Sequence, residues 1–189
     1  DFASRYYDVP EAEDVKMTFG LPVATLAMMA PVQFNNLMGL QKQNCSLMEM
    51  LGGGYYYVDT YSQDHNRKTN LRVAAKRLAV SMRQYQIKLL GIMAMDVKSE
   101  AAKEAYQVYV DANDQLEGIV VLQYSPYAGG EGEVFWVTNK AGYDIPVITV
   151  KYSLWDRIHE REGSPDFIAS KLKEEAQEES FSVVCVHAW

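Results

Sequence analysis

Several features that would indicate a function directly are scarce or missing in this sequence of 189 residues. No uninterrupted apolar run approaches the ~18 residues of a membrane-spanning helix, so no segment is expected to cross a membrane. The net charge of −7 argues against a nucleic-acid-binding surface. The sequence therefore predicts neither a membrane span nor a nucleic-acid partner.

Histidine and cysteine are also rare. His65, His159 and His187 do not share the spacing with which a helix holds a metal ion. Cys45 and Cys185 lie in apolar stretches without metal-ligand spacing, so we expect buried free thiols rather than a disulfide. The sequence predicts no metal site and no cofactor.

Motifs for nucleophilic and phosphate chemistry are missing as well. No nucleophile-elbow pattern occurs. The glycine run 52–54 lacks the Lys-Ser/Thr pair of a phosphate loop and leads into tyrosines rather than a helix. Carboxylate chemistry is what remains.

Two runs rich in glycine and tyrosine are the most informative features that are present. They are residues 52–57 (GGGYYY) and 123–130 (QYSPYAGG), and each follows a strand-like segment. Glycines let the backbone turn sharply and leave room beside it. Tyrosines offer flat faces and hydroxyls to a ligand. Together the runs predict one aromatic-lined pocket, and sugar rings suit such a pocket.

The order of the apolar segments predicts an α/β fold for residues 22–189. Mainly parallel strands should alternate with helices, in a barrel-like arrangement or as part of a larger barrel. Strands are expected near 46–51, 89–95, 118–124, 146–151 and 181–186, with a short strand at 134–137. Residues 1–21 are expected to be an irregular N-terminal segment.

Helical patterns lie between these strands. Helices are predicted at 22–43, with a new turn or kink at Pro31, and at 66–88, 99–112 and 164–179. No helix follows the strand predicted at 181–186. We therefore expect a preceding N-terminal domain, a neighbouring subunit or the N-terminal segment to cover an apolar face.

The carboxyl ends of parallel strands meet at one edge, where ligands bind. Aromatic and histidine side chains follow the predicted strands, and we expect them to bind the substrate together: Tyr55, Tyr57, Tyr124, Tyr127, Trp155, His187 and Trp189. Each has a structural alternative, because aromatics at strand ends also cap the core and a histidine there can be structural.

The candidate catalytic residues are carboxylates at the same edge. Glycoside hydrolysis needs two carboxyls across the scissile bond, one of them protonated. Asp96 is the best single candidate, because it ends a buried strand where burial would favour the protonated form. Its partner is Asp59 or Glu131, and the sequence does not choose. Asp96 could instead cap the following helix, and Glu131 could be a solvated loop residue.

The residues Gly52-Gly53-Gly54-Tyr55-Tyr56-Tyr57-Val58 resemble the signature of the GxGYxYP family, with Val58 where the family has proline. Residues 122–130, 146–155 and 186–189 are similar to later stretches of that family's C-terminal domain, in the same order. The resemblance covers about residues 17–189.

The resemblance implies a domain that follows an N-terminal domain in secreted proteins, extracellular or periplasmic, that process carbohydrate as glycoside hydrolases. Two functions stay open: a carbohydrate-active domain of glycoside-hydrolase type, and a non-catalytic module that binds glycan or serves as a structural subunit. Two carboxyls roughly 5–10 Å apart in one cleft favour hydrolysis. Aromatics without such a pair favour binding.

Overall fold

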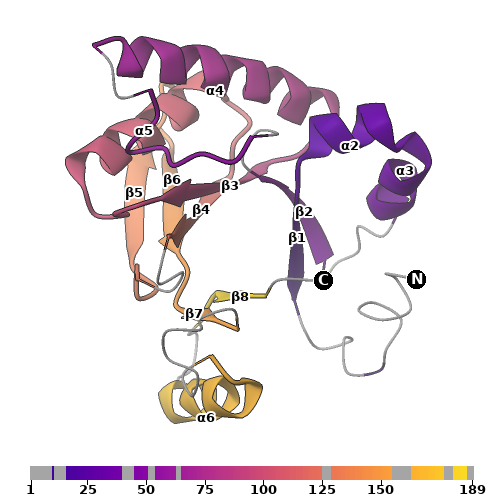
Figure 1. Ribbon diagram of the computed structural model, residues 1–189, viewed down its shortest axis with the longest axis vertical. Helices are drawn as coiled ribbons and strands as arrows, with labels where there is room; N and C mark the ends of the chain where they lie inside the picture. The colour runs from indigo at the N-terminus through magenta and orange to yellow at the C-terminus, as the bar shows by residue number, and fades with distance from the viewer. Residues whose placement is uncertain are drawn as a thin grey trace.

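The computed structural model describes residues 10, 16–39, 45–50, 54–62, 65–124, 129–154, 163–176 and 181–186 (Figure 1). Within these residues, a six-stranded sheet has the order β1-β2-β3-β4-β6-β5. The strands are β1 (Met17–Leu21), β2 (Cys45–Met50), β3 (Leu89–Ala94), β4 (Gly118–Gln123), β5 (Val134–Thr138) and β6 (Asp144–Thr149). Neighbouring strands are parallel except β5 and β6, which are antiparallel.

The described helices are α2 (Val23–Met29), α3 (Pro31–Gly39), α4 (Arg67–Gln84), α5 (Glu100–Ala112) and α6 (Pro165–Glu175). Figure 1 shows α4 and α5 along one face of the sheet, with α6 on the opposite side. Ser99 and Ser164 are N-caps whose hydroxyls accept backbone N–H bonds, and Pro165 begins its helix. Pro31 starts α3, as the sequence predicted.

The face beneath α4 and α5 carries the main core. Leu90 and Ile92 of β3 and Ile119 and Val121 of β4 point into it, together with Tyr106 of α5. These side chains are fully buried, with at most 1% of their surface exposed. Alternate residues of a strand point to opposite faces of the sheet, so the residues between these point to the other face.

The opposite face holds a smaller apolar cluster. Met93, Leu122 and Val150 are buried there, and Val183 and Cys185 pack against them. The covering segment belongs to a second, two-stranded sheet of β7 (Tyr152–Ser153) and β8 (Val184–Cys185). Cys185 is a free thiol whose pKa is raised to about 11 by burial. The side chain of Cys45 lies outside the described residues.

The α/β class and the mostly parallel sheet are confirmed, one expectation stays unconfirmed, and two need correction. The described strands form no closed barrel, so the barrel-like arrangement is not confirmed. The segment 181–186 is not a strand of the main sheet, because β8 pairs with β7 instead. Met17–Leu21 is not irregular: Met17, Phe19 and Leu21 alternate with more exposed residues, and β1 pairs with β2.

Candidate functional site

Three tyrosines gather at the edge where β2, β3 and β4 end, which we call the carboxyl edge. The ring centroids of Tyr55 and Tyr57 are 5.8 Å apart, and those of Tyr57 and Tyr124 are 5.0 Å apart. The hydroxyl of Tyr57 also donates to that of Tyr55 at 3.4 Å. Tyr55 is 65% exposed and Tyr124 38% exposed. We call these three residues the tyrosine cluster.

The backbone explains why the cluster forms. Tyr57 makes a parallel bridge to Met93 of β3, and the N–H of Val58 donates to the Met93 carbonyl at 2.9 Å. The N–H of Tyr124 donates to the carbonyl of Ala94 at 2.8 Å. Both tyrosines are thus held beside the end of the same strand. Tyr57 of the first glycine–tyrosine run thus contacts Tyr124 of the second, and residues 52, 53 and 125–128 of these runs lie outside the described residues.

Asp59 joins the tyrosine-bearing loop to the turn after β3. Its Oδ1 accepts the N–H of Met95 at 3.0 Å, and its Oδ2 accepts the N–H of Asp96 at 2.9 Å. Hydrogen bonds from backbone N–H groups to an ionised carboxylate are stronger than those between neutral groups, so they hold the turn firmly. Asp59 therefore lies next to the turn that holds Asp96, and both of its carboxylate oxygens accept backbone N–H groups of that turn.

Asp96 is exposed, so the burial that the sequence suggested for it is absent. Its Oδ1 accepts the N–H of Lys98 at 2.9 Å, and its carbonyl accepts the N–H and hydroxyl of Ser99. Ser99, and not Asp96, caps α5. The Oδ2 atom of Asp96 has no hydrogen bond within the described residues.

Glu131 lies farther out, on the loop after β4. Its side chain is 77% exposed, and its Oε2 is 3.9 Å from the Nζ of Lys98, which pairs more closely with Glu133 at 2.6 Å. Glu131 and Gly132 have φ values of 58° and 77°, so the loop turns through two successive left-handed residues. Asp96 and Glu131 thus flank one lysine.

Four predicted site residues, Tyr127, Trp155, His187 and Trp189, lie outside the described residues. Among the others, the structure brings Tyr55, Tyr57 and Tyr124 together, and it places the Asp59 carboxylate against the backbone of Asp96. Burial, with Asp59 and Asp96 as further causes, raises the pKa of Tyr106 beneath the edge.

Sequence reasoning missed a buried polar group on the helix-covered side of this edge. Tyr56 points away from its neighbours in the chain, and its hydroxyl bonds that of Tyr109 of α5 at 2.6 Å. Its ring packs on Tyr61 with centroids 4.8 Å apart. Glu49, 1% exposed, interacts electrostatically with Tyr56. The signal for Glu49 was a single carboxylate within the apolar run 45–51.

Burial raises the pKa of Glu49 to about 7, and the N–H groups of Val23 and Ala24 oppose this rise. Its Oε2 accepts the N–H of Val23 at 2.9 Å. Its Oε1 has no hydrogen-bond partner among the described residues. The group is therefore poised to gain or lose a proton near neutral pH.

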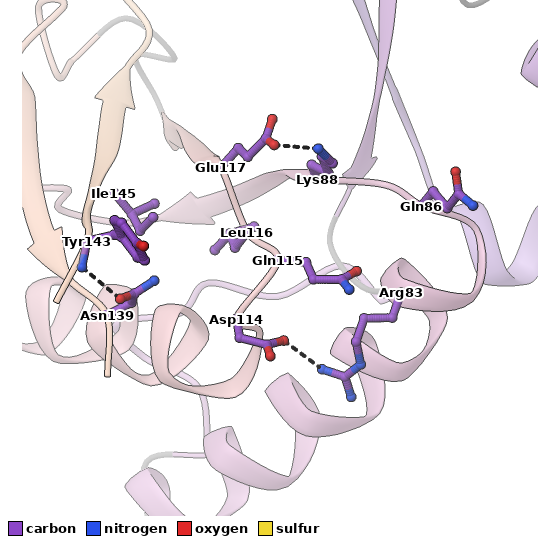
Figure 2. A pocket seen from close by; sticks show the side chains of 10 residues that line it. All are labelled: Arg83, Gln86, Lys88, Asp114, Gln115, Leu116, Glu117, Asn139, Tyr143 and Ile145. Carbon is purple, nitrogen blue, oxygen red and sulfur yellow. Dashed lines mark hydrogen bonds and ion pairs between the residues drawn. The ribbon is translucent and has the colours of Figure 1, made fainter. Parts of the chain in front are cut away.

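An open hollow of about 690 Å³ lies at the opposite, amino edge of β3, β4 and β6. Figure 2 shows that Arg83 faces Asp114 and that Lys88 faces Glu117 across it. The other lining residues are Gln86, Gln115, Leu116, Asn139, Tyr143 and Ile145. Its basic side chains are matched by acidic ones, and it contains none of the predicted site residues.

Comparison with known proteins finds no matching family model, no matching curated protein and no matching solved structure. In the part of the chain that the structure describes, no helix is long and apolar enough to span a membrane. No group of histidine, cysteine and acidic side chains within the same part could hold a metal ion. The candidate site is thus defined by its own geometry.

Proposed function

We propose that the tyrosine cluster binds carbohydrate, in a domain of the glycoside-hydrolase type that the GxGYxYP resemblance implies. One observation carries the proposal: Tyr55, Tyr57 and Tyr124 form a connected, partly exposed aromatic surface at the carboxyl edge. The apolar face of a pyranose packs against aromatic rings, and its hydroxyls bond phenol oxygens.

The charges around the cluster favour a neutral, hydroxyl-rich ligand. Asp96 and Glu131 are exposed at the same edge. Carboxylates accept hydrogen bonds from sugar hydroxyls and repel anionic ligands such as phosphates. An uncharged glycan therefore agrees with both the aromatic and the acidic parts of the surface.

The test is a glycan array followed by calorimetry with the best ligand. Tyr55→Ala and Tyr124→Ala should each weaken binding about tenfold, because each removes one aromatic contact worth about 1–1.5 kcal/mol. Tyr143→Ala is the matched control, since Tyr143 is 70% exposed but lies at the amino edge. Equal affinities for all four proteins would contradict the proposal, and so would an array without any bound glycan.

Hydrolysis is the second candidate, and the exposed carboxylate of Asp96 in the turn after β3 favours it. Asp96→Asn keeps an oxygen that can accept the Lys98 N–H, so the turn before α5 should survive. We expect this variant to abolish turnover of the bound glycan and to leave its affinity largely unchanged. Unchanged turnover would remove Asp96 as the catalytic residue, and absence of turnover in the unmodified protein would leave binding alone.

A further inference from the structure

We propose that Glu49 is a proton-controlled latch for the N-terminus of α2: the neutral carboxyl retains the helix on β2, and ionisation favours its detachment. The inference concerns the helix-covered side of the sheet and does not depend on carbohydrate binding. It rests on the position of the Glu49 carboxyl, on the hydrogen bond that only one of its two oxygens accepts, and on its apolar neighbours.

The first step is the contact itself. Val23 is the first residue of α2 and is fully buried, and its N–H donates to the Glu49 Oε2 at 2.9 Å. Pro22, which precedes it, provides no side-chain cap for the helix. Glu49 of β2 therefore accepts a backbone N–H of the first turn of α2, which is the role that an N-cap side chain usually has.

The second step is that the surroundings do not compensate a charge on Glu49. Its partners across the sheet are Leu21 of β1 and Leu90 of β3, both apolar. The sequence of α2, VATLAMM, has no ionisable side chain. An ion buried among such groups without a counter-ion is strongly disfavoured.

The remaining elements around Glu49 offer phenols and apolar side chains. Tyr56 of the 54–62 loop is the titratable group that interacts with it, and Tyr61 and Tyr109 lie behind Tyr56. From α4, the buried residues of the same core are Leu71, Ala75, Leu78 and Met82. No charged side chain of the described residues contributes to the shift of the Glu49 pKa, whose causes are burial and two backbone N–H groups.

The third step is that α2 is weakly retained elsewhere. Val23 is its one fully buried residue, whereas Met28 and Met29 are 81% and 80% exposed. Leu26 and Ala27 pack only partly against the core. Once the carboxyl is ionised, detachment of the first turn lets water reach it, and few other contacts oppose this motion.

The test is native-state hydrogen exchange followed by NMR between pH 5 and 7.5, corrected for the intrinsic pH dependence of exchange. The probes are the amides of Val23, which bonds Glu49, and Leu26, which bonds the Pro22 carbonyl. The control is the amide of Lys103 in α5, which bonds the Ser99 carbonyl. We expect protection of Val23 and Leu26 to fall at least tenfold with rising pH, while that of Lys103 stays constant.

Glu49→Gln keeps the shape of the neutral carboxyl and cannot ionise, so its protection factors should not depend on pH. A constant or rising protection of Val23 in the unmodified protein would overturn the proposal, and so would the same fall in the variant. The side-chain carboxyl carbon of Glu49 provides a second readout that needs no variant. The latch requires a titration midpoint near 7, and one near 4.5 overturns it.

Discussion

The three consecutive tyrosines divide into two environments within one short segment. Tyr55 and Tyr57 belong to the partly exposed cluster, and Tyr56 lies on the other side, bonded to Tyr109 beneath the helices. Burial raises the pKa values of Tyr56 and Tyr109. Side chains of an extended backbone alternate, so one run supplies both a candidate binding surface and part of the core. The same residue type stabilises the fold on one side and is available to a ligand on the other.

The largest expected effect lies on the buried side, at Tyr106. This side chain has no exposed surface, and its hydroxyl donates to the Val97 carbonyl at 2.8 Å. Tyr106→Ala should reduce the free energy of unfolding by about 4 kcal/mol, because it leaves a large cavity. Chemical denaturation would measure the change. A loss no larger than that of an exposed tyrosine would contradict the division between the two environments.

The next largest effect depends on pH and concerns Glu49. Its folded-state pKa of about 7 exceeds the usual 4.5. The stability that this group contributes is therefore complete below pH 4.5 and is lost as the pH rises through 7. The difference between the two pKa values corresponds to a loss of roughly 3 kcal/mol.

Unfolding free energies of Glu49→Gln and the unmodified protein should accordingly diverge with rising pH, the variant becoming the more stable of the two above pH 7. Denaturant titrations at pH 5, 6, 7 and 8 would measure this. A constant difference across the series would show that Glu49 does not titrate in that range.

A smaller effect is expected from the phenol pair. Tyr109 is only 2% exposed, and its hydroxyl lies 2.6 Å from the hydroxyl of Tyr56. Tyr56→Phe removes this hydrogen-bond partner and leaves the buried Tyr109 hydroxyl unpaired. Loss of one partner of a buried hydrogen bond costs about 1–3 kcal/mol. The double variant Tyr56→Phe/Tyr109→Phe should recover part of this loss in denaturation experiments, because neither polar group then remains. Strictly additive losses would rule out the pair as a unit.

The smallest effect is expected at Tyr55. Because this side chain is 65% exposed, Tyr55→Ala should change the unfolding free energy by less than about 0.5 kcal/mol. Thermal and chemical unfolding would both detect a larger value. A loss comparable to that of Tyr56→Phe would mean that the tyrosine cluster is a part of the core and not a surface for a ligand.

Local signals in the sequence predicted much of the fold. Ser99, Ser164 and Pro165 mark helix starts that the structure contains, because caps depend on residues within one turn. The strands β2, β3, β4 and β6 follow from their apolar runs. The prediction for segment 181–186 was wrong because strand pairing depends on residues far away in the sequence. In the structure, β8 pairs with Tyr152–Ser153 and not with the main sheet. No local pattern encodes that choice.

The site was predictable to a similar degree. Parallel strands end at one edge, and this rule predicted that residues after different strands would meet there. The structure has Asp59 next to Asp96 and Tyr57 beside Tyr124 at that edge. The rule did not reveal that Asp59 is occupied by backbone N–H groups, because hydrogen bonds depend on the path of the turn. Glu49 was missed because the apolar run around it was interpreted only as a strand.

The order of strands in the sheet has a consequence for how the chain acquires its structure. From β1 to β4, each strand lies beside the one made just before it. A chain emerging from the ribosome can therefore add one strand at a time to a growing edge, with few distant pairings to wait for. The exception is the final pair, since β6 must join β4 although β5 is synthesised first. Among the described strands of this sheet, insertion of β6 between β4 and β5 is thus the step that departs from the order of synthesis.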